Sequence, residues 1–183
     1  MRQAELNVVF VSVLMGMVVG MATRAHTDAV RLAGQAAEVR REIGNDWWIP
    51  LIRRLSRGRW RVHRGLPVTR DLGSPWQDTV ASERTGWRTR AAWLHGEHIF
   101  AVDYRVCRRC RIGWVENPAT FEPYRRCGLA TAGLLALRAD HPGLTWHTLG
   151  GHFPVPRPFW ESVGSGVPGG YEQGPLCPHV DRG

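Results

Sequence analysis

The sequence predicts an α+β domain with a mixed, mostly antiparallel sheet flanked by helices. Three observations lead to this class. Helical periodicity dominates residues 27–55, strand alternation dominates residues 91–115, and a helix, a strand and a short helix follow one another from residue 128. Separate blocks of helices and antiparallel strands are typical of α+β folds.

The first predicted helix begins at Thr27-Asp28 and ends at Gly44. Its apolar positions recur every three or four residues, at Leu32, Ala36, Val39 and Ile43. A second, short helix is expected over residues 47–55. Residues 56–86 are rich in Arg, Gly, Pro and Ser, and no regular element is predicted there.

A hairpin and a third antiparallel strand are predicted next. Residues 91–94 and 98–106 alternate apolar with polar or small side chains on either side of a turn at His95-Gly96. Cys107-Arg-Arg-Cys110 is expected to make a tight turn into a third strand over residues 111–115.

The C-terminal third continues with mixed elements. A helix is predicted over residues 128–140, closed by His141-Pro142-Gly143, and a strand over residues 144–148. A short helical piece follows around residues 158–164, and a final strand is expected near Tyr171.

The composition is that of a folded chain. The 183 residues are enough for one domain with an appendage, and 43% are hydrophobic while 22% are charged. This balance excludes wholesale disorder.

An apolar N-terminal segment stands apart from this domain. Residues 8–22, VVFVSVLMGMVVGMA, are fewer than the roughly 20 that span a bilayer, Arg2 is offset by Glu5, and no clean signal-peptidase site follows. A membrane anchor or signal, a packed element and an over-extended gene start remain open. We divide the chain into an apolar segment, 1–24, and a domain, 25–183. A cytoplasmic location is expected, with membrane association through the apolar segment as the alternative.

The formal net charge of +8 is weak evidence for nucleic acid binding. All 24 basic residues are Arg, which resembles a coding bias. The densest run, from Arg40 to Arg70, holds nine Arg against Glu42 and Asp46, and such a run is most often a solvated face. We therefore do not expect a nucleic acid partner.

One loop carries a phosphate-binding pattern. In PYRRCGLA, residues 123–130, Arg125, Gly128 and Ala130 match the Gln/Arg-x-x-Gly-x-Gly/Ala pyrophosphate loop of the GNAT superfamily of acyl-CoA-dependent N-acyltransferases. Downstream, Phe159-Trp160-Glu161-Ser162-Val163-Gly164 takes the place of that family's Phe-Tyr-x-x-x-Gly helix. The chain resembles this family over residues 90–173, which implies a GNAT-like fold.

The resemblance implies acetyl-CoA or another acyl-CoA as co-substrate and an amine-bearing acceptor. A helix N-terminus binds phosphate through unpaired N–H groups and its dipole, and arginines add charge-assisted contacts. The alternative is a basic turn that merely opens a core helix. The residues expected to bind the co-substrate are Trp114, Val115, Arg125, Arg126, Cys127, Gly128, Leu129, Ala130 and Thr131.

The resemblance also implies roles in catalysis. A main-chain N–H between Trp114 and Glu116 would polarise the thioester carbonyl, and Glu116 is the candidate base, unless it is a solvent-facing strand end. Trp160 replaces the family's tyrosine acid, and an indole is a poor proton donor. Tyr124 or Tyr171 could substitute, and we take Tyr171 as the candidate.

The cysteines suggest a structural zinc site. Cys107-x-x-Cys110 is half of a tetrahedral site, and Cys177-Pro-His179 could supply the rest if the C-terminal residues fold back. Free thiols or disulfides are the alternatives. Besides an acyltransferase, we therefore consider a non-catalytic acyl-CoA-binding protein and a zinc-containing nucleic-acid-binding module.

Overall fold

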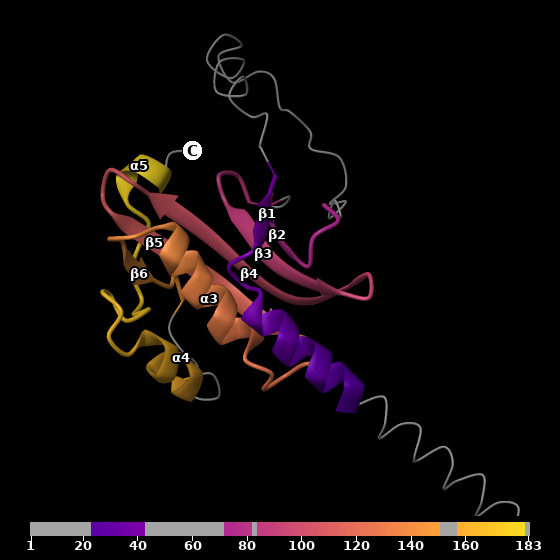
Figure 1. Ribbon diagram of the computed structural model, residues 1–183. Helices are drawn as coiled ribbons and strands as arrows, with labels where there is room; N and C mark the ends of the chain where they lie inside the picture. Colours follow the sequence, from indigo (N-terminus) through magenta and orange to yellow (C-terminus); the bar gives the residue numbers. More distant parts are fainter. Residues whose placement is uncertain (1–22, 43–71, 82–83, 151–156, 182–183) are drawn as a thin grey trace, which may run out of the picture.

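The computed structural model describes residues 23–42, 72–81, 84–150 and 157–181. Within these ranges a six-stranded mixed sheet is flanked by helices (Figure 1), so the predicted α+β class is confirmed. The strands are β1 (Val39–Arg41), β2 (Trp76–Val80), β3 (Arg88–Leu94), β4 (Glu97–Cys107), β5 (Ile112–Thr120) and β6 (Thr145–His147). The helices are residues 23–34, α3 (Leu129–Asp140), α4 (Arg157–Gly164) and α5 (Pro178–Asp181).

The strands lie in the sheet in their chain order. β2 to β5 form an antiparallel meander, while β1 pairs parallel to β2 and β6 pairs parallel to β5. The predicted hairpin is confirmed: at its turn His95 and Gly96 have φ of 53° and 80°, as a two-residue type I′ turn requires. The third predicted strand also forms, and it continues beyond residue 115 to Thr120.

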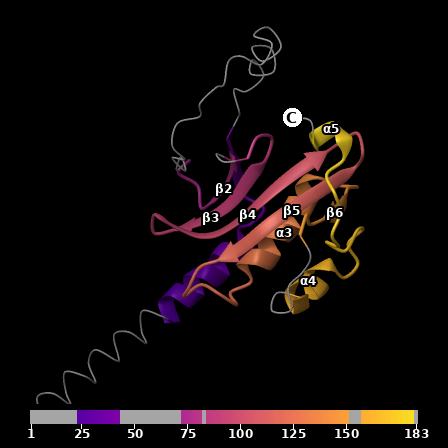
Figure 2. The same ribbon diagram turned by 180° about the vertical axis from the view of Figure 1, so that it is seen from behind.

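Residues 23–34 and α3 lie across one face of the sheet, and the view from behind shows β3, β4 and β5 in front of them (Figure 2). α3 sits close to the sheet at Gly133, where a Cβ would lie 2.6 Å from Phe100 Cε1. The indole Nε1 of Trp76 donates to the carbonyl of Leu32 at 2.8 Å, which ties the N-terminal helix to β2. Each of these large buried side chains contributes roughly 1.5–3 kcal/mol.

The predicted extent of the N-terminal helix is wrong. Its described part covers residues 23–34, and Val39 lies in β1, where it pairs with Trp76 of β2. Val39 is β-branched and therefore suits a strand at this edge of the sheet. Its pairing with β2 outweighs the helical spacing of the apolar residues before it. No helix in the described ranges is long and apolar enough to cross a membrane. The apolar segment 8–22 and the predicted helix 47–55 lie outside those ranges.

Two further differences concern β2 and the C-terminus. β2 was not predicted, because Gln77 and Asp78 at its centre are polar yet almost fully buried. The final strand expected near Tyr171 is wrong: that residue lies in a turn with φ of 58°, and only an isolated bridge between Thr148 and Gln173 follows. The short helix α5 was not predicted either.

A cluster of buried charges joins α3 to the sheet. The fully buried Arg90 donates to Asp78 Oδ2 at 2.9 Å and to Asp140 Oδ2 at 2.6 Å. The Tyr104 hydroxyl donates to Asp78 Oδ2 at 2.7 Å. Burial raises the pKa of Asp140, but hydrogen bonds from Arg41 and Arg90 outweigh it and hold this pKa below its ordinary value. The carboxylate at the end of α3 is therefore kept charged by β1 and β3.

We expect Arg90→Met to lower the free energy of unfolding by about 3 kcal/mol, because it removes two charge-assisted hydrogen bonds and leaves Asp78 to Arg88 and Tyr104 and Asp140 to Arg41. The matched control is Arg31→Met, whose ion pair with Asp28 is exposed and contributes less than about 1 kcal/mol. Urea denaturation of both variants checks the difference. Equal losses in the two variants would show that the buried cluster has no special role in stability.

Candidate anion-binding cleft and candidate metal centre

The start of α3 is an open helix N-terminus. The N-cap residue Gly128 has φ of 79°, in the left-handed region that favours glycine, and Arg126 also has a positive φ of 61°. No side chain caps this helix, and its first turn holds no acidic residue. The first-turn N–H groups and the positive end of the helix dipole are therefore available to an anion.

This N-terminus opens into a cleft of about 590 Å³. The cleft lies where two parallel strands part: β6 pairs with β5 only from Ile112 to Trp114, and β5 then continues to Thr120. The residues that line it come from β5, the loop before α3, the first turn of α3, the chain that follows β6, and α4. They are Val115, Glu116, Asn117, Pro118, Thr120, Tyr124, Arg125, Arg126, Gly128, Leu129, Ala130, Thr131, Thr148, Gly150, Phe159 and Trp160.

Most of the residues predicted to bind a co-substrate meet in this cleft. They are Val115, Arg125, Arg126, Gly128, Leu129, Ala130 and Thr131, joined by the predicted base Glu116. Val115 and Glu116 are successive strand residues, whose side chains point to opposite faces of a sheet. Both border the cleft at the point where β5 and β6 separate, and Val115 is at the same time fully buried in the main core.

Three predicted residues lie outside the lining. Trp114 is fully buried, and its Nε1 donates to the carbonyl of Gly174 at 3.2 Å. The buried Cys127 has its Sγ 3.2 Å from Nδ1 of His26, and burial raises the pKa of its thiol. Tyr171 is also fully buried.

The hydroxyl of Tyr171 is occupied within the protein, because it accepts a hydrogen bond from Arg138 Nη1 at 2.8 Å. Burial raises the pKa of Tyr171, although Arg138 opposes this shift. The tyrosine that does line the cleft is Tyr124, on the loop before α3. Nothing in the local sequence pattern separates the two tyrosines, since the difference comes from burial in the tertiary structure.

Glu116 is held in place by the chain that follows β6. Its Oε1 accepts the backbone N–H of Leu149 at 2.6 Å, and Asp103 of β4 lies directly opposite in the register. Sequence reasoning did not assign Thr148 and Phe159, which also line the cleft. Both come from segments that reach the cleft only through the fold, so a local motif could not reveal them.

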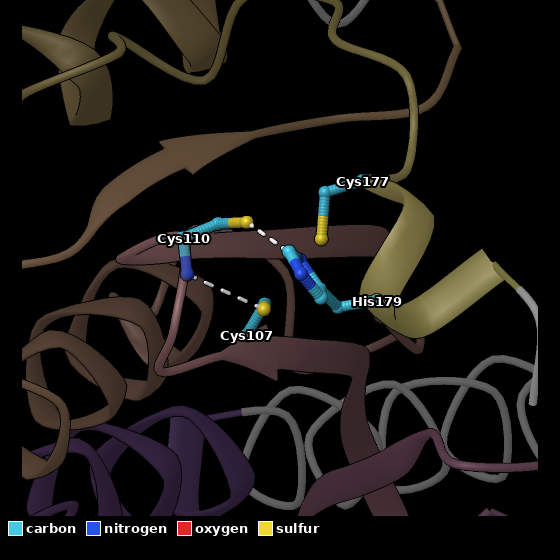
Figure 3. Close-up of side chains that lie close together, drawn as sticks. All are labelled: Cys107, Cys110, Cys177 and His179. Carbon is cyan, nitrogen blue, oxygen red and sulfur yellow. Dashed lines mark hydrogen bonds between the residues drawn. The ribbon is translucent and has the colours of Figure 1, made fainter.

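Three cysteines and one histidine form a second cluster (Figure 3). The ligand atoms of Cys107, Cys110, Cys177 and His179 all lie within 4.8 Å of one another. β4 ends at Cys107, the following turn carries Cys110, and α5 with the residue before it supplies the other two. The structure thus brings together the four predicted ligands, and all cysteines are free thiols.

The geometry and the chemistry of the cluster suit a cation. The Cys110 N–H lies 3.5 Å from Cys107 Sγ, and this hydrogen bond lowers the pKa of the Cys107 thiol. The hydrogen bond with the Cys177 thiol raises the pKa of Cys110 to about 11. Neighbouring thiols disfavour each other's ionisation unless a cation balances the charge. Cys110 Sγ is 3.1 Å from His179 Nδ1, so sulfur and imidazole donors converge and could hold a metal ion.

Comparison of the sequence with models of known protein families and with curated proteins finds no match. A function must therefore be inferred from the cleft and from the cluster of three cysteines and one histidine.

We expect the purified chain to hold about one metal ion, measured by plasma mass spectrometry, and Cys107→Ser to lose it. Removing the ion with a chelator should lower the melting temperature by about 10 °C, because several kcal/mol of binding free energy stabilise the folded state. Cys127→Ser is the control, since Cys127 lies outside the cluster and its loss should leave the metal content unchanged. A metal-free chain with the melting temperature of untreated protein would contradict this assignment.

Proposed function

We propose that this chain is an acyl-CoA-dependent N-acyltransferase of the GNAT superfamily that transfers an acetyl or related acyl group to an amine. One observation carries the proposal. The uncapped N-terminus of α3, with Gly128 at its start and Arg126 beside it, opens into a cleft formed where β5 and β6 part. This arrangement suits a pyrophosphate bound at the helix end, with the rest of the ligand extended along β5.

Arg126 is the better placed of the two loop arginines to bind phosphate. Arg125 already donates to the carbonyl of Thr120 at 3.1 Å and pairs with Glu122 at 3.2 Å. Arg126 has no ion pair with another described residue, and it lines the cleft. Its guanidinium can therefore form charge-assisted hydrogen bonds with a phosphate without breaking a contact.

The exposed edge of β5 supplies the remaining contacts. Beyond Trp114 this edge has no partner strand among the described residues, so its backbone groups can bond to an extended ligand. A β5 N–H near Val115 would stabilise the oxyanion that forms when the amine nitrogen attacks the thioester carbonyl carbon. Collapse of that intermediate breaks the carbon–sulfur bond and releases CoA as a thiolate.

Glu116 is the proposed base. One of its oxygens is held by the Leu149 N–H, which orients the carboxylate at the cleft, and the carboxylate takes a proton from the substrate ammonium, directly or through water, so that the free amine can attack. The CoA thiolate can leave without being protonated, because an ordinary thiol has a pKa of about 8.5. Tyr124 lines the cleft and replaces Tyr171 as the proposed proton donor to it.

Zn²⁺ is the proposed occupant of the metal cluster. Three thiolates and one imidazole complete a tetrahedral coordination, which is typical of structural zinc and leaves no open position for chemistry. The ion would therefore stabilise the fold and take no part in acyl transfer.

A second candidate is an acyl-CoA-binding protein without turnover. Trp160 lines the cleft where the family has a tyrosine, and Tyr171 is buried against it with ring centroids 5.3 Å apart. Both observations favour binding without efficient catalysis. The nucleic-acid-binding alternative depends on the run from Arg40 to Arg70, most of which lies outside the described residues.

Acetyl-CoA at about 100 times its Kd should raise the melting temperature by about 5–10 °C. Gly128→Asp should abolish the shift, whereas Gly128→Asn should retain most of it. The two side chains have the same shape and both tolerate a positive φ, and open space surrounds the position, so they differ in the charge placed beside the phosphate. Thermal scans of the three proteins check this. An unshifted melting temperature for the wild type at millimolar acetyl-CoA would refute the proposal.

Glu116→Gln should slow acyl transfer by about 100-fold or more, because the amide still accepts the Leu149 N–H but cannot take a proton. Thiol release from acetyl-CoA, with polyamines, amino-acid amides and short peptides as acceptors, measures the rate. Acetyl-CoA binding should be unchanged in this variant. Wild-type protein that binds acetyl-CoA but releases no thiol with any amine would favour the non-catalytic candidate.

A further inference from the structure

Residues 172–177, which we call the tail strap, run from the wall of the cleft to the metal cluster. The strap ends at Cys177, and α5 with His179 follows it directly (Figure 3). α5 has only four residues, too few for a helix to be stable by itself. The position of the strap's far end therefore depends on what Cys177 and His179 bind.

The strap pairs with the chain that follows β6. The N–H of Thr148 donates to the carbonyl of Glu172 at 3.1 Å, and the N–H of Gly174 donates back to the carbonyl of Thr148 at 2.8 Å. The side-chain amide of Gln173 donates to the carbonyl of Leu149 at 3.0 Å. Thr148 lines the cleft, so the strap acts as a supporting strand behind the cleft wall.

The strap also contacts β5 through Trp114. The indole N–H donates to Gly174 of the strap, and the ring packs in a small core with Cys107 and Cys177 of the metal cluster. Two residues further along β5, Glu116 receives the N–H of Leu149. One continuous set of contacts thus runs from the cluster, through Trp114 and the strap, to both sides of the cleft.

We propose that metal binding at this cluster holds the cleft wall, residues 146–150, in its binding geometry by anchoring the tail strap. The metal is then a positioning element for the cleft as well as a local staple. Metal occupancy and occupancy of the cleft strengthen each other, because coupling between two sites is reciprocal. The identity of the cleft ligand as an acyl-CoA rests on the proposed function, whereas the link between metal and wall does not.

Hydrogen exchange followed by mass spectrometry tests the link on the full chain, loaded with zinc, stripped by a chelator, and reloaded. Stripping should reduce protection of residues 144–150 and of the strap, and reloading should restore it. Peptides from α3 are the internal control, because α3 packs on the other face of the sheet and should keep its protection. Unchanged protection of residues 144–150 on stripping would overturn the inference.

One pair of variants and one single variant make the test specific. His179→Ala should lose zinc and weaken acetyl-CoA binding by about 5- to 150-fold, while His179→Cys keeps four donors and should retain both zinc and affinity.

Trp114→Phe keeps all four ligands but loses the hydrogen bond to Gly174. It should bind zinc normally and show reduced protection of residues 144–150. If residues 144–150 of Trp114→Phe were protected as strongly as in the wild type, the inference would be overturned. This result would count even if the wild-type protein unfolds entirely when it is stripped of metal.

The outcomes separate this inference from the proposed function. If zinc-loaded protein fails to bind acetyl-CoA while protection of residues 144–150 still depends on zinc, the proposed function fails and the structural link stands. If acetyl-CoA binds equally well with and without zinc and protection is unchanged, the link fails and the proposed function stands.

Discussion

The separation of β5 from β6 is the constraint on which the rest of the site depends. The two strands are held together at their base by Trp146, whose ring lies against Gly113, where a Cβ would approach it to 2.6 Å. Beyond three paired residues the chain after His147 no longer pairs with β5, while residues 168–174 bond to residues 146–148 both within β6 and after it. Close packing at the base and the loss of pairing with β5 above it create the opening that becomes the cleft.

Groups outside the cleft fix both of its sides. On the α3 face, Arg138 donates to the carbonyl of Val163 at 3.2 Å and to the Tyr171 hydroxyl, which joins the end of α3 to α4 and to the turn after it. On the other face the metal cluster and the tail strap support the segment after β6. The Arg138 hydrogen bonds and the contacts of the tail strap do not include the residues of the loop before α3 that line the cleft. These contacts therefore do not prevent the loop from contacting a ligand.

Apart from the approach of Cys177 and His179 to the Cys107-x-x-Cys110 turn, the features that the sequence predicts correctly are local. The turn at His95-Gly96, the helix after Gly128 and the Cys107-x-x-Cys110 turn each depend on neighbouring residues and appear as expected. β2 was missed because Asp78 is paired with Arg88 and Arg90, so its burial depends on partners on another strand. The burial of Tyr171 likewise comes from α3 and α4, and periodicity carries no information about it.

The proposed replacement of the family's tyrosine by Trp160 agrees with the packing of this residue. Its ring lies against Tyr171 and Phe159, with centroids 5.3 Å from each, so Trp160 and Phe159 form the floor that α4 gives to the cleft, and the buried Tyr171 packs against Trp160. A tyrosine at this position would bring a hydroxyl into that floor, and the indole brings a larger apolar surface. In the proposed acyltransferase the site would therefore have a rigid wall in place of the family's acid. Proton donation to the leaving thiolate would then fall to Tyr124 or to water, and a thiol pKa of about 8.5 makes the thiolate a tolerable leaving group even without it.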